Sequence, residues 1–256
     1  MAVVMELNTK HAANSDRPRI AIPEPCGYDS EYSNRSLAPY LRAMEAAGSE
    51  PVIVPLASSP EEIARIAANC SAILLPGSKA DVDPQKYNAQ RDPHTAAADP
   101  RRDAADELLL QDAYNLRKPV LGICYGLQSL NVWRTGTLVQ HIHSQVNHEA
   151  GSKVEIAHQV LLDPDSLLGR EIAQGAHSIP VNSSHHQSAE VVGDGLKIAA
   201  RCPEDQIIEA VEGTQPGHYV VAVQWHPERG FERDPSSQNL FRSFIQAARE
   251  WLLTQR

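Results

Sequence analysis

The sequence predicts an α/β protein with a mainly parallel central sheet, helices on both faces of that sheet, and a strand-rich C-terminal portion. Short apolar runs alternate with helix-length segments up to about residue 150. This alternation is typical of parallel sheets whose strands are joined by helical crossovers. Beyond residue 150 the pattern becomes strand-rich, and one last helical segment closes the chain.

Helices and strands alternate regularly in the first half of the chain. The helix at residues 34–47 ends before Gly48, a residue type that commonly stops helices. The helix at residues 60–69 has proline at its first position, where the missing N–H has no cost. The other elements expected in this half are strands at 19–23, 51–55 and 71–75 and a helix at 99–117.

The second half begins with a buried strand at residues 120–123. A second buried strand is expected at 219–224, a hairpin at 197–201 and 207–212, and a helix at about 236–254. No linker rich in Pro, Gly or Ser interrupts the chain, so residues 18–256 are predicted to form a single catalytic domain. Residues 1–17 are polar and irregular in pattern, and we expect them to be a mobile N-terminal extension.

Composition excludes several classes of partner. The net charge of −9 argues against nucleic acid and anionic membranes. No apolar run approaches the roughly 20 residues of a membrane span, and no signal-peptide pattern is present. The four cysteines lie far apart without a Cys-x-x-Cys pair, which predicts reduced thiols in the cytoplasm. A small-molecule partner is expected, and the sequence leaves a homodimer open.

The most informative segment is Gly122-Ile123-Cys124-Tyr125-Gly126, which follows the buried strand at 120–123. A Gly-x-Cys-x-Gly sequence between a strand and a helix is the cysteine form of a nucleophile elbow. At the N-terminus of the helix, the dipole and the free N–H groups favour the thiolate of Cys124. The alternative is a cysteine that simply fills the core.

A second segment, Gln224-Trp225-His226-Pro227-Glu228, follows the other buried strand. Proline at 227 biases His226 toward extended backbone, and residues two apart in extended chain project to the same side. Glu228 is therefore expected to hold one nitrogen of His226 while the other faces a nucleophile. The alternative is a strand end with a surface histidine and glutamate.

The elbow and the His-Pro-Glu sequence resemble the class I glutamine amidotransferase-like superfamily, in its branch of γ-glutamyl-γ-aminobutyrate hydrolases and γ-glutamyl hydrolases. The resemblance runs from about residue 19 to the C-terminus. It implies a flavodoxin-like α/β fold, a Cys124–His226–Glu228 catalytic triad, a γ-glutamyl thioester intermediate, and no cofactor. The further segments that carry it are Leu74–Gly77 with Asp81–Pro84, Arg102–Asp103 with Glu107, Gln128–Val132, Gly136–Gln140 and Val181–Gln187.

The oxyanion of the expected reaction needs backbone donors. One is the N–H of Tyr125, directly after the nucleophile. The resemblance implies that the second is at Gly77 or Ser78; without it, Pro76-Gly77 would be interpreted as an ordinary turn after a strand. Tyr125 stands where many members of the polyamine pathway carry arginine, which makes the distal half of the substrate hard to predict.

Gln128 lies one helical turn after Cys124. The resemblance implies that Gln128, His185 and His186 help to form the γ-glutamyl pocket. The alternatives are that Gln128 satisfies nearby backbone groups and that a histidine packs beneath the site. Asp81 and Asp83 are interpreted as residues that structure a loop or bind a cationic group.

No metal site is predicted. Two histidine pairs, His141 with His143 and His185 with His186, could ligate a metal in principle, but no cysteine or carboxylate completes a recognisable ligand set.

Three functions are compatible with these motifs. The leading hypothesis is a stand-alone hydrolase that releases glutamate and an amine from γ-glutamyl conjugates. The runner-up is a glutaminase subunit that supplies ammonia to a separate synthetase. The third is a binding protein that keeps the fold without the activity.

Overall fold

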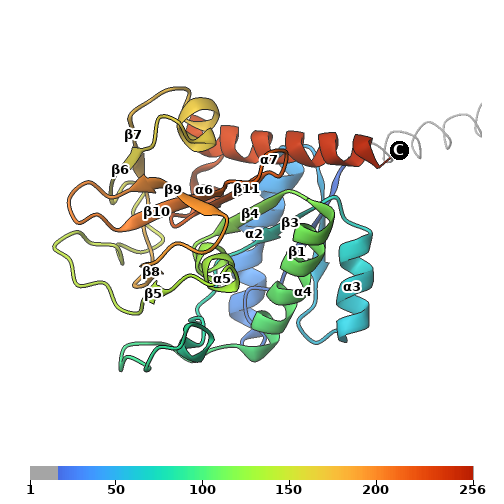
Figure 1. The fold of residues 1–256 in the computed structure, drawn as a ribbon, viewed down its shortest axis with the longest axis horizontal. Helices are drawn as coiled ribbons and strands as arrows, with labels where there is room; N and C mark the ends of the chain where they lie inside the picture. The colour runs from blue at the N-terminus through green and yellow to red at the C-terminus, as the bar shows by residue number, and fades with distance from the viewer. Residues whose placement is uncertain (1–16, 256) are drawn as a thin grey trace, which may run out of the picture.

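The computed structural model describes residues 17–255, so the predicted extension at 1–17 lies outside the described residues except for Arg17. A nine-stranded sheet runs through the molecule (Figure 1). Its strand order is β2-β1-β3-β4-β11-β10-β9-β6-β7. The order of the first four strands and β11 is that of a flavodoxin-like sheet, 2-1-3-4-5.

Five strands of this sheet are parallel: β1 (Arg19–Pro23), β2 (Glu50–Val54), β3 (Ala72–Leu75), β4 (Val120–Ile123) and β11 (Val220–Val223). Every residue of β3, β4 and β11 is buried. Continuous apolar runs are expected for parallel strands that helices cover on both faces. The mainly parallel sheet that the sequence predicts is confirmed.

Two helices, α2 (Ser30–Ala46) and α7 (Pro235–Thr254), pack on one face of the sheet. Three others, α3 (Pro60–Ala68), α4 (Pro100–Leu116) and α5 (Tyr125–Trp133), pack on the other. Successive side chains of β1 point to opposite faces of the sheet. Ile20 and Ile22 therefore pack in the core under α2 and α7, whereas Ala21 packs in the core under α3, α4 and α5. Within residues 17–255, no helix is long and apolar enough to cross a membrane.

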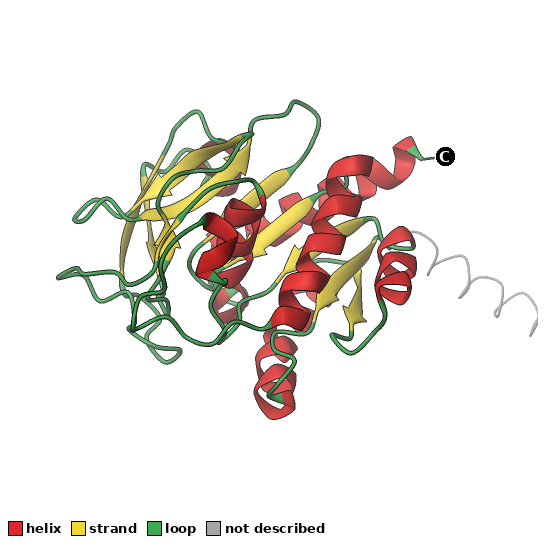
Figure 2. Ribbon diagram, turned by 60° about the horizontal axis from the view of Figure 1, so that its bottom comes forward, coloured by secondary structure: helices red, strands yellow, loops and turns green. Residues whose placement is uncertain are grey.

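The sheet continues into an antiparallel part made of β6 (His158–Leu162), β7 (Ser178–Val181), β9 (Leu196–Arg201) and β10 (Ile208–Gly213). Figure 2 shows these strands extending beyond the helix-covered part. The predicted hairpin is present as β9 and β10, and the strand-rich C-terminal portion is confirmed. The remaining elements are β5 (Leu138–Val139), β8 (Ser188–Ala189), α6 (Pro227–Gly230) and the short turns η1 (Pro84–Tyr87) and η2 (Leu168–Ile172).

Helix α2 starts four residues earlier than the sequence predicts. Asp29 caps it, because its side chain accepts a hydrogen bond from the N–H of Tyr32 at 2.9 Å. The predicted end differs by one residue: the helix stops at Ala46, Ala47 is its C-cap, and Gly48 takes a left-handed φ of +89° just beyond it.

Strands β3, β4 and β11 are neighbours, and their carboxyl ends lie at the same edge of the sheet. Leu75 pairs with Gly122, and Gly122 pairs with Ala222. The N–H of Cys124, just beyond β4, donates to the carbonyl of Val223 at 2.8 Å. The three segments that follow these strands therefore converge, at the edge where open α/β sheets bind their ligands.

Candidate active site

Cys124 lies at a sharp turn between β4 and α5. Its backbone has φ +54° and ψ −107°, a conformation that L-residues rarely adopt. A side chain at Gly126 would put its Cβ 2.1 Å from the carbonyl oxygen of Leu75. Glycine is therefore required there for the helix to pass so close to β3. The predicted elbow is present as a structure, and Cys124 is 5% exposed.

His226 and Glu228 lie directly after β11. Nδ1 of His226 donates to Oε1 of Glu228 at 2.8 Å, and both side chains are buried. The pairing agrees with the prediction, but its backbone differs. Glu228 lies in the first turn of α6 rather than in extended chain, because Pro227 starts that helix.

The environment of His226 favours its protonated form. Burial alone would lower its pKa, but the charges of Glu228 and Cys124, together with hydrogen bonds to both, outweigh burial and raise the pKa to about 9. At neutral pH the ring is therefore an imidazolium, suited to stabilise a thiolate and to give up a proton.

Asn182 holds the backbone of His226 from the opposite side. Its Oδ1 accepts from the His226 N–H at 2.9 Å, and its Nδ2 donates to the His226 carbonyl at 2.8 Å. Asn182 belongs to the Asn-Ser-x-His-His-Gln segment, in which the sequence predicts roles only for the histidines. A side-chain amide that matches both backbone groups of one residue is a positioning contact, visible only in three dimensions.

Gly77, which follows β3, lies against both His226 and Cys124. A Cβ at Gly77 would be 3.0 Å from Cε1 of His226 and 3.6 Å from Cβ of Cys124. The Gly77 N–H donates to the hydroxyl of Tyr40 on α2 at 3.0 Å. Tyr40 also lies 3.5 Å from Nδ1 of His226, and sequence reasoning did not single it out.

The three predicted oxyanion donors differ in their surroundings. The N–H of Gly77 is engaged by Tyr40, so Gly77 can serve only if its peptide turns away from that hydroxyl. Tyr125 is the first residue of α5, where a backbone N–H has no acceptor within the helix. Ser78 uses its hydroxyl to accept from the N–H of Ala80 at 3.0 Å. The oxyanion role of all three residues stays a prediction.

Arg102 supports the Pro76–Gly77 loop through a buried hydrogen bond. It is fully buried, and its guanidinium donates to the carbonyl of Pro76 at 2.6 Å, the carbonyl of Pro25 at 3.2 Å and Asp106 at 2.7 Å. The planar fork of arginine allows these simultaneous contacts. The sequence pointed to Arg102 only as part of a family segment.

The side chain of Tyr125 packs inside the protein. Arg102 lies 4.8 Å above its ring, and its hydroxyl donates to Asp103 at 2.6 Å. With an exposed fraction of 1%, this side chain is part of the support of the elbow.

Gln128 and His185 meet on the main chain of Gln187. Nε2 of Gln128 donates to the Gln187 carbonyl at 3.1 Å, and Nδ1 of His185 lies 2.9 Å from the same oxygen. Both side chains are buried. This geometry matches the alternatives in which Gln128 satisfies backbone groups and His185 packs beneath the site. Their contact with substrate stays a prediction.

His186 points in another direction, toward the loop after β3. Its Nε2 lies 3.0 Å from Asp81, whose other oxygen accepts from the N–H of Ala96 at 2.6 Å. Asp83 caps η1 by accepting from the N–H of Gln85 at 3.0 Å. Both aspartates therefore structure the loop, which was one of their two predicted roles.

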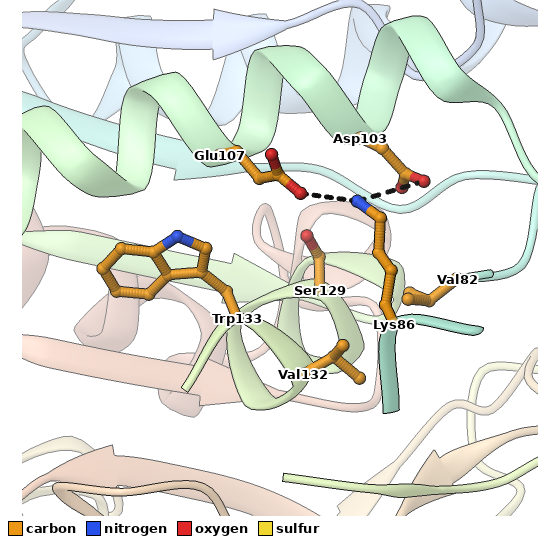
Figure 3. A pocket seen from close by; sticks show the side chains of 7 residues that line it. All are labelled: Val82, Lys86, Asp103, Glu107, Ser129, Val132 and Trp133. Carbon is orange, nitrogen blue, oxygen red and sulfur yellow. Dashed lines mark hydrogen bonds and ion pairs between the residues drawn. The ribbon is translucent and has the colours of Figure 1, made fainter. Parts of the chain in front are cut away.

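A cavity of about 250 Å³ lies between α4, α5 and η1 (Figure 3). Nζ of Lys86 lies 2.7 Å from Glu107 and 3.3 Å from Asp103, and these contacts connect η1 to α4. Asp103 thereby bonds to both Lys86 and Tyr125. Since its lining does not include the Cys124–His226 region, we interpret the cavity as part of the support behind the elbow. The lining residues are Val82, Lys86, Asp103, Glu107, Ser129, Val132 and Trp133.

Comparison with known families identifies this arrangement. The model of the Peptidase C26 family matches residues 26–228, which include the elbow and the His-Pro-Glu segment. The chain belongs to the Peptidase C26 family. The resemblance to class I glutamine amidotransferase-like proteins that the sequence indicates is thereby confirmed.

Individual relatives cover most of this Peptidase C26 chain. The Mycobacterium tuberculosis protein Rv2859c is 35% identical over 218 residues, which are 82% of this chain and 67% of the relative. Gamma-glutamyl-gamma-aminobutyrate hydrolase PuuD of Escherichia coli K12 is 32% identical over 218 residues, which are 81% of this chain and 84% of the relative. The glutaminase domain of Trypanosoma brucei CTPS has a similar fold, with a TM-score of 0.60, 17% identity and coverage of 91% of this chain and 94% of that one.

Proposed function

We propose that this Peptidase C26 protein is a cysteine-dependent hydrolase of γ-glutamyl amide bonds that releases glutamate and an amine. The observation that carries the proposal is the convergence of Cys124 on a strained elbow with the His226–Glu228 pair, at the ends of neighbouring strands. The relatives support the bond type, since PuuD is named as a hydrolase of a γ-glutamyl amide.

In the proposed reaction, the thiolate of Cys124 attacks the side-chain amide carbon of the γ-glutamyl group. The charged form of His226 stabilises the thiolate and then gives its proton to the leaving amine. Glu228 holds the ring in place through Nδ1 and stabilises its charge. Water then hydrolyses the γ-glutamyl thioester, which releases glutamate and restores the thiol.

The oxyanion that forms during each attack needs donors that are already in place. The N–H of Tyr125 is the best supported candidate, because it begins α5 directly beside the nucleophile. Gly77 or Ser78 would supply the second donor. Removal of one such donor typically lowers the rate by about 10²–10³-fold.

The alternative function, a glutaminase subunit that supplies ammonia to a synthetase, has less support than the γ-glutamyl hydrolase. The same site would serve it, but a relative that matches over 84% of its own length, PuuD, is named as a gamma-glutamyl-gamma-aminobutyrate hydrolase. We also propose a cytoplasmic location, supported by four buried cysteines that form no disulfide among residues 17–255.

Glutamate release from a panel of substrates tests the proposal. The panel contains glutamine, γ-glutamyl-γ-aminobutyrate, a γ-glutamyl dipeptide and a poly-γ-glutamate. We expect release from at least one conjugate, abolished by Cys124→Ala and retained by Cys70→Ala, whose thiol is buried in a helix-covered core. Undiminished turnover by Cys124→Ala would contradict the mechanism. If the protein hydrolyses only glutamine, and a synthetase stimulates that activity, the glutaminase-subunit alternative would be favoured.

A further inference from the structure

A second cluster of titratable side chains lies in the antiparallel part of the sheet, and it shares only His185 with the residues of the candidate active site. Glu209 on β10 is completely buried, and His158 on β6 donates from Nε2 to its Oε1 at 2.9 Å. Two more buried histidines approach Glu209 from loops: His148 from the segment after β5, and His185 from the segment after β7. The proposed hydrolase mechanism does not use Glu209, His148 or His158.

Two histidine nitrogens of this cluster lie close to one carboxylate oxygen, Oε1 of Glu209. Nδ1 of His148 lies 3.3 Å from Oε1 of Glu209, and Nε2 of His185 lies 3.7 Å from it. One ligand atom from each of the three residues lies within 4.8 Å of the others. Two of these three atoms, Nδ1 of His148 and Nε2 of His185, are buried and have no hydrogen-bond partner among the described residues. Oε1 of Glu209 accepts from His158, and the second carboxylate oxygen, Oε2, is the one left without a partner among those residues. Buried polar atoms left in this way are costly and require an explanation.

The outward-facing nitrogens of both rings are already engaged. Nε2 of His148 lies 2.8 Å from Asp205, and Nδ1 of His185 lies 2.9 Å from the carbonyl of Gln187. Carboxylate and carbonyl oxygens accept hydrogen bonds, so the proton of each neutral ring is on the outward nitrogen. In these neutral forms the inward nitrogens present lone pairs to the Glu209 carboxylate, and a metal cation between them would stabilise that arrangement. Without a metal, burial would lower the pKa of His148, but hydrogen bonds from the protonated ring to Glu209 and Asp205 outweigh burial and raise the pKa, so a proton on the ring meets the carboxylate instead.

We propose that His148, His185 and Glu209 bind a divalent transition-metal ion, with zinc the best match to two imidazoles and one carboxylate. In a tetrahedral zinc site with bonds of about 2.0–2.1 Å, ligand atoms are roughly 3.3 Å apart. The distances of 3.3 and 3.7 Å from Glu209 to the two nitrogens are close to this value.

Each proposed ligand has a partner that orients it. Asp205 orients His148, the Gln187 carbonyl orients His185, and His158 orients Glu209. Such outer contacts are typical of metal-binding histidines and carboxylates. Access is also available, because His148 and His185 line a cavity of about 300 Å³.

A second group of possible ligands, His148 with Cys202 and Asp205, is less suitable. It would use the nitrogen of His148 that already bonds to Asp205. In addition, burial raises the pKa of the Cys202 thiol to about 12, which opposes the thiolate that a metal needs.

The proposed ion would connect β10 to both loops. The segment that carries His185 also carries Asn182, which holds the backbone of His226. The metal is therefore proposed as a structural ion that keeps this segment in place, beyond the hydrolase function and independent of it. This proposal departs from the metal-free protein that the sequence predicts, because His148 and Glu209 are far from His185 in sequence.

Metal content tests the proposal without any activity measurement. The full-length protein is stripped with a chelator, incubated with Zn²⁺ or Co²⁺, separated from free metal and analysed by mass spectrometry. We expect about one ion per chain, a higher melting temperature, and a Co²⁺ spectrum with no thiolate charge-transfer band. No retained ion in the wild-type protein would overturn the proposal and leave a metal-free cluster of histidines around Glu209.

Variants locate the ion. Glu209→Gln and His148→Ala should lose it, whereas the double variant His141→Ala/His143→Ala should retain it, because these histidines lie outside the three-residue group. If Glu209→Gln retained as much metal as the wild-type protein, the assignment of Glu209 as a ligand would be wrong. If either variant fails to fold, the Co²⁺ spectrum of the wild-type protein still distinguishes the two possible ligand groups. A thiolate charge-transfer band would show that Cys202 is a ligand and would contradict the proposal.

Discussion

The N–H of Gly77 donates a hydrogen bond to the hydroxyl of Tyr40 at 3.0 Å. The same hydroxyl lies 3.5 Å from Nδ1 of His226. One buried side chain of α2 therefore supports both the loop after β3 and His226, the proposed proton donor after β11. This contact also means that Gly77, a predicted oxyanion donor, is engaged inside the protein in this structure.

Replacement of Tyr40 by phenylalanine tests this supporting role. We expect kcat to fall by up to about tenfold with little change in KM, because one neutral hydrogen bond contributes about 1 kcal/mol to positioning. Steady-state kinetics measures the change. Tyr114→Phe is the control, since Tyr114 lies on α4 and its buried hydroxyl has no hydrogen-bond partner among the described residues. An unchanged kcat in Tyr40→Phe would show that the contact does not position the site.

The pH dependence of activity should reflect the charge on His226. Its pKa is raised to about 9, so kcat/KM should be steady near neutral pH and fall as the pH rises through about 9. Glu228→Gln removes the largest of the influences that raise this pKa, and the fall should then begin at lower pH. A pH–rate profile of both proteins measures the shift. An identical alkaline fall in the two profiles would contradict the pairing.

The same ionisation contributes to stability. Since the folded-state pKa of His226 lies above its ordinary value of 6.5, the contribution is complete below pH 6.5 and is lost as the pH rises to about 9. Its upper bound is about 3 kcal/mol. We expect His226→Gln to lower the free energy of unfolding more at pH 6 than at pH 9.5. Urea denaturation at both values measures the difference, and a larger loss at pH 9.5 would reverse the assigned sign.

Arg102→Lys should destabilise the protein by about 3 kcal/mol. Lysine cannot reproduce the contacts of the buried guanidinium with Pro76, Pro25 and Asp106. The neighbouring Arg101 is exposed, and Arg101→Lys should change stability by no more than about 0.5 kcal/mol. Chemical denaturation of the two variants gives the comparison. If the two variants were equally stable, the hydrogen bonds of the buried Arg102 guanidinium would not be important for the fold.

Gly126→Ala should lower stability by at least about 1–3 kcal/mol, because the new methyl group would lie 2.1 Å from the Leu75 carbonyl and force α5 away from β3. Gly230→Ala is the control, since a Cβ there would make an ordinary contact of 3.7 Å with Asp234. Thermal unfolding measures both. If Gly126→Ala were as stable as the wild-type protein, the close approach at the elbow would be wrong.

The sequence predicted the elements with the clearest patterns. The strands at Arg19–Pro23 and Val120–Ile123 have the predicted bounds, since each is a short apolar run that begins just after proline or a charged residue. The start of α2 was wrong because its cap, Asp29, precedes a polar first turn that shows no apolar periodicity. The elbow was predictable because its two glycines, Gly122 and Gly126, each lie two positions from Cys124.

The features that the sequence predicts are therefore local: the alternation of strands and helices, the elbow at Cys124, and the pairing of His226 with Glu228, which lie two residues apart. The tertiary structure alone decided the partners of these groups. Tyr40 and His226 are 186 positions apart in the chain, and His158 and Glu209 are 51 apart. Periodicity reports which face of an element is buried, whereas the order of strands in the sheet determines which buried side chains meet.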